Sequence, residues 1–76
     1  MSDTFNKLKP LFVELRIDED KIVPEAKLIE DLNFDSLDSV EIVIDTEELF
    51  DIVIEDADVD NFVTIQDIIT YIDERI

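Results

Sequence analysis

Residues 36–50 form an uninterrupted run of helix-forming residues, and we expect the rest of the chain to be organised around this segment. Asp35 stands directly before this run, so its carboxylate can accept a hydrogen bond from the first helical turn, and Asp38 can return one to the Asp35 backbone. The pattern predicts a helix that presents the Ser36 hydroxyl at its first turn. A phosphate ester there would meet free backbone N–H groups and the positive end of the helix dipole. The alternative is that Ser36 is only part of the cap.

Length and residue content narrow the possible functions. Seventy-six residues are enough for one small domain, which we expect to span residues 1–76. The chain has no cysteine or histidine, so no disulfide, zinc site or imidazole base is available, and an enzyme with Ser36 as nucleophile is not expected. No apolar run is long enough to cross a membrane, and the acidic start does not resemble a signal peptide. We therefore expect a cytoplasmic monomer without membrane insertion.

The sequence also contains no glycine. Turns and helix C-caps often need the left-handed backbone conformation that glycine adopts most easily. We expect asparagine and aspartate to occupy these positions instead.

The formal net charge of −16 comes from 22 acidic and 6 basic residues. Such a surface repels nucleic acid and favours protein partners with basic surfaces. Neither lysine nor arginine occurs between residues 28 and 74. A disordered acidic segment would fit this charge, but it would not fit an apolar content of 46% that is arranged periodically.

Apolar spacing predicts a first helix and a long loop after it. The first helix is marked by apolar residues three or four positions apart, Phe5, Leu8, Phe12 and Leu15. Pro10 lies inside this segment and should cause a kink or a late start. Residues 17–34 are expected to form an ordered loop anchored by its apolar side chains, Ile22, Val23, Leu28, Ile29 and Leu32.

Two further helices are predicted toward the C-terminus. Residues 56–62 suggest a short helix anchored by Val59 and Phe62. Thr64 and Asp67 have the spacing of a capping box, which opens a last helix with a buried face of Ile65, Ile68, Ile69 and Ile72. The predicted fold is therefore an all-α four-helix bundle with three longer helices, a short third helix, and a long loop between helices one and two.

The helix at residues 36–50 has distinct faces when its residues are placed at 100° intervals. Its acidic residues form one stripe, Asp38, Glu41, Asp45 and Glu48, with no basic residue placed to offset their repulsion. Val40, Val43 and Phe50 point roughly the opposite way, toward an expected core. Leu37 and Ile44 lie beside the acidic edge. These two residues and the acidic stripe together form a predicted partner-docking surface, although an acidic stripe can also be merely solvated.

A calcium site is a competing interpretation. Asp56, Asp58 and Asp60 match the opening of an EF-hand loop with Asp67 at its twelfth position, and a second opening begins at Asp31. Both candidate loops lack the glycine at position six and the glutamate at position twelve. We expect no specific metal site, but weak divalent binding at two clusters of acidic residues, Glu30, Asp31, Asp35 and Asp38 in one and Glu47, Asp51 and Asp56 in the other.

The segment from Asp31 to Val43, which contains Asp35-Ser36-Leu37-Asp38, resembles the attachment-site motif of acyl carrier proteins. The resemblance continues through residues 47–51, 64–67 and 71–72. It implies that Ser36, flanked by Asp35 and Leu37, carries 4′-phosphopantetheine derived from coenzyme A. The prosthetic thiol would hold acyl groups as thioesters for fatty-acid or related polyketide or specialised lipid biosynthesis. A peptidyl or aminoacyl carrier is the alternative within the same class.

The resemblance also implies partners and a place for the cargo. The partners would be a phosphopantetheinyl transferase and basic-surfaced enzymes such as acyltransferases and ketosynthases. The acyl chain would be sheltered in the bundle, where the candidate lining residues are Val40, Val43, Phe50, Ile54, Ala57, Val59, Phe62 and Ile69. The alternative is that these residues are simply core.

The chain departs from the family pattern at several positions. Asn33 and Phe34 stand where the family usually has Gly-Ala, so we expect an exposed Phe34 beside the prosthetic arm. Asp45 and Thr46 replace small or aliphatic residues, and Glu55 replaces a frequent proline. These differences suggest a specialised carrier rather than the housekeeping fatty-acid carrier.

Overall fold

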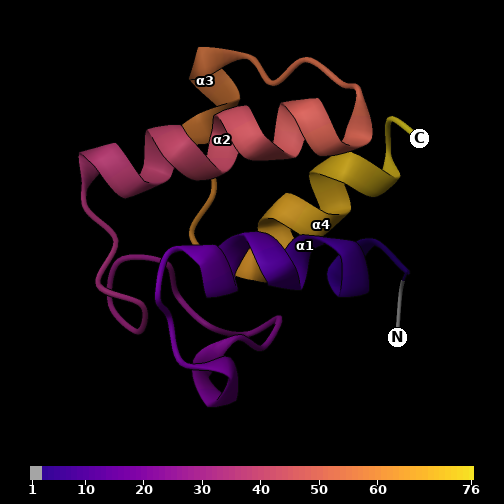
Figure 1. Cartoon of the computed structure of the whole chain (residues 1–76). Coiled ribbons are helices and arrows are strands. Elements are labelled where there is room, and N and C mark those ends of the chain that lie inside the picture. The colour runs from indigo at the N-terminus through magenta and orange to yellow at the C-terminus, as the bar shows by residue number, and fades with distance from the viewer. Residues whose placement is uncertain (1–2) are drawn as a thin grey trace.

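The computed structural model describes residues 3–76. Within this range the chain forms four α-helices and one short 3-10 helix: α1 (Asp3–Glu14), η1 (Glu19–Lys21), α2 (Ser36–Phe50), α3 (Asp56–Val59) and α4 (Ile65–Asp73) (Figure 1). The only extended pairing among these residues is an isolated antiparallel bridge between Lys27 and Thr64. The predicted all-α fold with a short third helix and a long loop before the second is confirmed.

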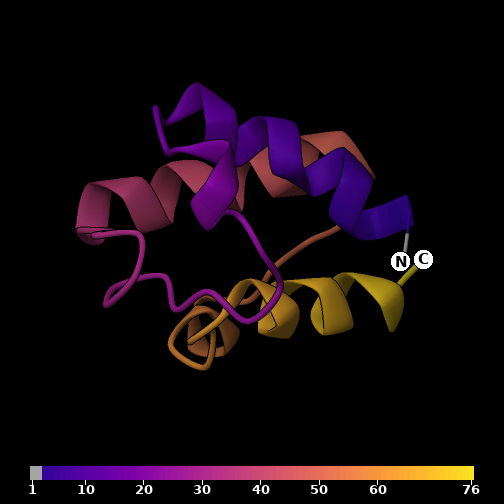
Figure 2. The ribbon, with the colours of Figure 1, turned by 90° about the horizontal axis from the view of Figure 1, so that it is seen from below.

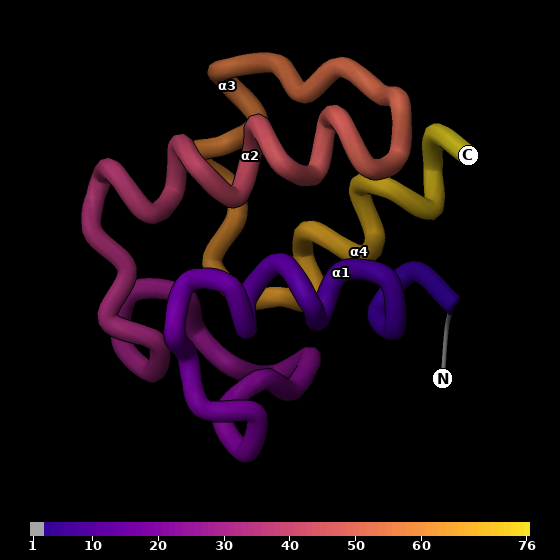
Figure 3. Tube along the Cα trace, in the orientation of Figure 1, coloured from indigo at the N-terminus to yellow at the C-terminus, as the bar shows by residue number. Residues whose placement is uncertain are grey.

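The three longer helices surround one core. The chain runs in opposite directions along α1 and α2, and α4 packs against α1, as Figures 1 and 2 show. The core cluster takes Phe5, Leu8 and Phe12 from α1 and all four isoleucines of α4. Figure 3 shows the loop after α1 passing below that helix and returning to the end of the molecule where α2 starts. The start of α2 is therefore held by the loop, close to the end of α1.

Pro10 lies inside α1 without delaying the start of the helix, so the predicted late start is wrong. Pro10 has no N–H to donate to the carbonyl of Asn6, one turn earlier. Both residues lie on the exposed face of α1. Water can reach that carbonyl. The buried face of α1 is otherwise as predicted, although Leu15 lies just beyond the helix and is only half-buried.

The loop is anchored by three of the five apolar side chains expected to do so, and by Ala26 and Phe34, which were not expected. Ile22, Leu28 and Leu32 are buried, but Val23 and Ile29 are exposed, Ile29 by 70%, so their predicted anchoring is wrong. The loop backbone pairs with the segment before α4, where the Leu28 N–H donates to the Val63 carbonyl at 2.9 Å and the Ile65 N–H donates to the Ala26 carbonyl at 3.1 Å. This pairing turns Leu28 inward and leaves its neighbour Ile29 facing solvent.

Helix α3 is shorter than predicted, because it ends at Val59 and residues 60–61 form a turn. Helix α4 begins where the sequence indicates. The Thr64 hydroxyl accepts a hydrogen bond from the Asp67 N–H at 3.2 Å, and the Asp67 carboxylate accepts one from the Thr64 N–H at 3.0 Å. The predicted capping box is therefore confirmed, as is the buried face of four isoleucines.

Asp67 should make a pH-dependent contribution to stability. Backbone hydrogen bonds, chiefly from Thr64 and then from Val63, hold the pKa of Asp67 below its usual value of 3.8, although burial opposes them. A lowered folded-state pKa stabilises the fold above the unfolded-state pKa, and this contribution disappears as the pH falls through the folded-state pKa. We expect Asp67→Ala to lower the free energy of unfolding by about 1–2 kcal/mol at pH 7.

The measurement is urea unfolding of Asp67→Ala and of a control, Asp60→Ala, between pH 7 and pH 2.5. Asp60 is exposed, and its carboxylate has no hydrogen-bond partner among residues 3–76, so both variants lose one charge but only one loses a cap. The difference between the two variants should shrink below pH 3.8. A difference that is constant with pH would contradict the argument.

Within residues 3–76, three non-glycine residues adopt the left-handed conformation: Arg16, Asn33 and Asp51, with φ of 66°, 57° and 54°. Asn33 and Asp51 confirm the expected residue types, whereas Arg16 was not anticipated. Arg16 ends α1 in a Schellman motif, in which its N–H donates to the Val13 carbonyl and the Ile17 N–H to the Phe12 carbonyl.

Replacing Arg16 by glycine should remove a backbone strain of about 1 kcal/mol, partly offset by the greater flexibility of unfolded glycine. Arg16→Ala loses the same charge but keeps the strain. Urea unfolding should therefore find Arg16→Gly more stable than Arg16→Ala by about 0.5–1 kcal/mol. Equal stabilities would show that this turn carries no strain.

Candidate functional site

Ser36 is the first residue of α2 and its side chain is exposed. The predicted capping box is confirmed, because Asp35 Oδ1 accepts from the Asp38 N–H at 2.9 Å and Asp38 Oδ2 accepts from the Asp35 N–H at 3.3 Å. The Ser36 hydroxyl has no hydrogen-bond partner among residues 3–76. The Ser39 hydroxyl, by contrast, donates to the Asp35 carbonyl at 3.1 Å. Of these two serines, only Ser36 presents an available hydroxyl.

The cap leaves a mixed electrostatic environment around Ser36. The Asp38 N–H donates to the Asp35 carboxylate. The N–H groups of Ser36 and Leu37 therefore remain without an intrahelical acceptor at the start of α2. The carboxylates of Asp35 and Asp38 lie beside them. An anionic group on Ser36 is attracted by the helix end but repelled by the two carboxylates, which favours a substituent that projects into solvent.

The predicted docking surface lies along one side of α2 and is only partly open. Glu41 and Glu48 are exposed, and the apolar residues beside them, Leu37 and Ile44, are 70% and 47% exposed. Asp38 and Asp45 are half-buried. No acidic residue of this surface forms an ion pair within the described part of the chain.

Asp38 shares a cavity with two basic residues, although it forms no ion pair with either of them within residues 3–76. It lines a polar cavity of about 290 Å³ together with Arg16 and Lys21, which the loop brings to the start of α2. Asp38 therefore belongs to the capping structure as well as to the stripe. Glu41 and Glu48 are the exposed acids of the stripe.

The core-facing side of α2 differs from the prediction. Ile42 and Thr46 are its buried residues, and Val40, expected in the core, is 54% exposed. Val43 and Phe50 are half-buried and pack against the core as expected. The Thr46 hydroxyl donates to the Ile42 carbonyl at 2.6 Å, which satisfies a polar group that is otherwise inaccessible.

A cavity of about 400 Å³ lies between α2 and α3. Four of the predicted acyl-pocket residues line it, Val40, Val43, Ile54 and Val59, but Phe50, Ala57, Phe62 and Ile69 do not. Sequence reasoning did not identify its other lining residues, Ile44, Glu47, Asp56 and Asp60. The Glu47 carboxylate accepts a hydrogen bond from the Ile54 N–H at 2.8 Å, so it holds the start of the α3 segment beside α2. A wheel analysis of α2 alone cannot reveal such a residue.

Phe34 is buried, so the prediction that it is exposed beside Ser36 is wrong. Its ring stacks on Phe12 of α1 with a centroid separation of 5.7 Å. The left-handed Asn33 and a hydrogen bond from the Phe34 N–H to the Leu28 carbonyl turn the ring into the core. Phe34 therefore fixes the approach to α2 and is not available to a partner.

The EF-hand interpretation is wrong for the described residues. The first four positions of the better candidate loop form α3, and Asp58 accepts a hydrogen bond from the Tyr71 hydroxyl at 2.8 Å. Within residues 3–76 no group of three or more acidic side chains could hold a metal ion. Several carboxylates of the predicted weak sites have other partners: Asp31 accepts from the Lys27 N–H, and Glu30 pairs with Lys27 at 3.2 Å.

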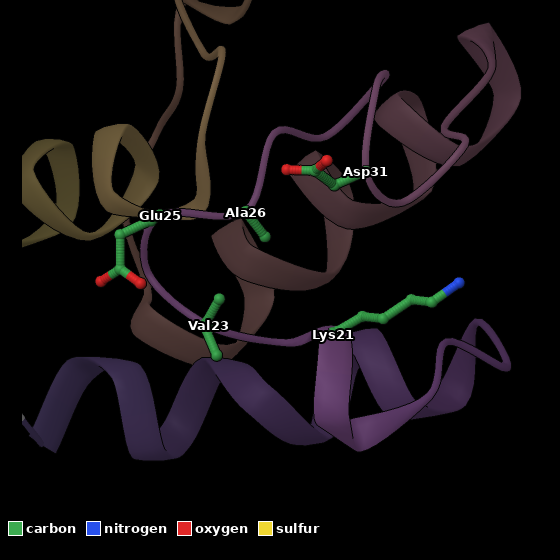
Figure 4. A pocket seen from close by; sticks show the side chains of 5 residues that line it. All are labelled: Lys21, Val23, Glu25, Ala26 and Asp31. Carbon is green, nitrogen blue, oxygen red and sulfur yellow. The ribbon is translucent and has the colours of Figure 1, made fainter.

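A separate cavity of about 320 Å³ lies in the loop between α1 and α2 (Figure 4). Its lining consists of Lys21, Val23, Glu25, Ala26 and Asp31, and the figure shows the Lys21 amine pointing away from Asp31. Neither Ser36 nor any residue of the docking surface lines this cavity. Within residues 3–76, no helix combines the length and the apolar character that a membrane crossing requires.

Comparisons with known proteins place this geometry in context. The sequence profile of a family described as acyl-carrier matches residues 10–75. A protein from Thermotoga maritima named acyl carrier protein is 41% identical over 75 residues, which cover 97% of this chain and 93% of the relative. Proteins of the same name from Campylobacter lari and Thermosynechococcus vestitus are 47% identical over 70 residues and 40% identical over 76 residues. The alignment with the Campylobacter lari protein covers 91% of this chain and 91% of the relative. The alignment with the Thermosynechococcus vestitus protein covers 99% of this chain and 94% of the relative.

Proposed function

The chain belongs to the acyl-carrier family, and on that basis we propose that it carries acyl groups as thioesters on a 4′-phosphopantetheine arm attached to Ser36. It delivers them to enzymes of fatty-acid or related polyketide or specialised lipid biosynthesis. The observation that carries this proposal is the exposed Ser36 hydroxyl at the start of α2, without a partner among the described residues.

The residues around Ser36 fit this prosthetic group. The Ser36 oxygen would form a bond to the phosphorus of coenzyme A that bears the pantetheine, while the bond to the nucleotide half breaks and the serine proton passes to a base of the transferase. Asp35 and Asp38 hold the first turn of α2 rigid, so the hydroxyl has a defined position. The bound arm supplies the thiol that this cysteine-free chain lacks.

The protein itself acts by delivery rather than by catalysis. The exposed acids and apolar residues of α2 lie on the helix that Ser36 begins, so an enzyme bound there is within reach of the arm. Tethering raises the effective concentration of the acyl group at a docked enzyme. Attraction between the acidic surface and basic partners speeds association. Because exposed ion pairs add little affinity, each complex is short-lived.

The cavity between α2 and α3 is the proposed shelter for the acyl chain. Its walls include the aliphatic side chains of Val43, Ile54 and Val59, and its edge includes the acidic Asp56 and Asp60. Each methylene removed from water there contributes about 0.8 kcal/mol. The exposed side chains of Val40 and Ile44 give the α2 side an apolar rim, through which the chain enters.

Incubation with coenzyme A and a broad-specificity phosphopantetheinyl transferase tests the proposal. The intact mass should increase by one phosphopantetheine group, and peptide mapping should place it on Ser36. Failure to load with several such transferases would overturn the proposal.

A further inference from the structure

Tyr71 of α4 makes several of the contacts that attach α3 to the rest of the molecule. Its hydroxyl donates a hydrogen bond to Asp58 Oδ2 at 2.8 Å and accepts one from the Glu55 N–H at 3.4 Å. Glu55 is the N-cap residue of α3, and Asp58 lies within that helix. One oxygen atom therefore holds both the start and the body of α3.

The ring of Tyr71 is positioned independently of its hydroxyl. Phe62 packs edge-to-face against it with centroids 5.3 Å apart, and the Arg75 guanidinium lies 3.4 Å from the ring centroid. Arg75 is also 4.0 Å from the Asp58 carboxylate. Burial, with the hydrogen bond to Asp58, raises the pKa of Tyr71 above its usual value, so the hydroxyl keeps its proton near neutral pH and can donate it.

Helix α3 is also one wall of the cavity between α2 and α3, to which it contributes Asp56 and Val59. The backbone hydrogen bonds found for residues 55–62 join these residues to one another. The position of the wall is therefore set by side chains: Glu47 of α2, which holds Ile54, and Tyr71 of α4, which holds Glu55 and Asp58. Figure 1 shows α3 as a single short coil on the outer side of α2. A change in these side-chain contacts can therefore move α3 as one unit.

We propose that Tyr71 is a positioning residue, whose hydroxyl holds α3 in place and thereby sets the length of acyl chain that the cavity accommodates. This inference rests on the proposed function, because it takes acyl groups as the cargo. Tyr71 acts through α3 and has no contact with Ser36. Releasing its two hydrogen bonds lets the wall move away from α2 and lengthens the space for the chain.

The first test uses the protein without its prosthetic group. Tyr71→Phe removes the hydroxyl but keeps the ring, and amide hydrogen exchange of residues 55–61 should become about tenfold faster. Asp58→Ala should act in the same direction from the α3 side. Thr70→Val is the matched control, because it also removes a hydroxyl from α4. Among the described residues, the Thr70 hydroxyl hydrogen-bonds only to Gln66. Equal exchange rates in Tyr71→Phe and Thr70→Val would overturn the inference.

The second test compares chain lengths. Wild type and Tyr71→Phe are loaded with butyryl, octanoyl, dodecanoyl and hexadecanoyl groups, and the increase in melting temperature over the unacylated form is measured for each. The chain length with the largest increase should be longer in Tyr71→Phe. A purely structural role would lower every melting temperature equally and leave this profile unchanged, which would overturn the inference. Intact mass shows separately whether loading occurred, so failure of the proposed function is distinguishable.

Discussion

Replacing Ser36 with alanine should abolish loading by a phosphopantetheinyl transferase completely. The expected effect is total because the prosthetic group requires a side-chain oxygen, and alanine has none. Ser36 is exposed and its hydroxyl bonds to no group in the described part of the chain, so the fold should lose no more than about 0.5 kcal/mol. The capping box depends on Asp35 and Asp38 and remains intact. Circular dichroism and intact mass after incubation with coenzyme A measure the two effects.

Ser39→Ala is the matched control for this experiment. Ser39 is one turn away, but its hydroxyl is bonded to the Asp35 carbonyl and its side chain is only half-exposed. This variant should load at the wild-type level. Ser2, the other serine, lies outside the described residues, so peptide mapping must include it. Phosphopantetheine on Ser2 or Ser39, or loading of Ser36→Ala, would show that the attachment site is misassigned.

Reversing the charge of Glu41 and Glu48 should slow association with basic partner enzymes by roughly tenfold or more at low salt. Both carboxylates are exposed, and neither forms an ion pair within residues 3–76. An exposed ion pair contributes only about 0–1 kcal/mol to affinity, so the effect should appear mainly in the association rate. The specificity constant kcat/KM for loading by the transferase, and for transfer to a ketosynthase, should be measured at low and high salt.

The control reverses Glu25 and Glu74, which changes the net charge by the same amount. Both are exposed and lie outside α2, in the loop and after α4. Asp58 and Asp73 are unsuitable, because they bond to Tyr71 and Thr4, and their reversal would disturb the fold. The wild type should slow as salt rises, whereas the Glu41/Glu48 variant should start slow and change little. Equal losses from both pairs would show that partners respond to total charge and not to α2.

Local sequence patterns predicted the starts of α2 and α4 well. The caps at Asp35 and Thr64 depend on hydrogen bonds between residues three apart, and the structure forms both as read from the sequence. Helix α3 was less predictable. It has only four residues and no side-chain cap, so its extent depends on contacts with Glu47 and Tyr71, which are distant in sequence.

The faces of α2 show why the remaining features could not be read from the chain. Its acidic stripe is visible in the sequence, but the direction of the core is set by where α1 and α4 lie. The core contacts Ile42 and Thr46, about a quarter-turn from the side expected opposite the acids. Val40 is displaced toward the cavity beside α3 for the same reason.

The sequence by itself determined the helical class, the capped start of α2, the exposure of Ser36 and the family resemblance, because these depend on neighbouring residues and on local hydrogen bonds. Only the tertiary structure decided that Phe34 stacks on Phe12, that Val40 faces the α2–α3 cavity, and that Tyr71 holds α3. Each of these joins residues that are far apart along the chain. Their burial depends on how the helices pack together, and no periodicity within one segment encodes that packing.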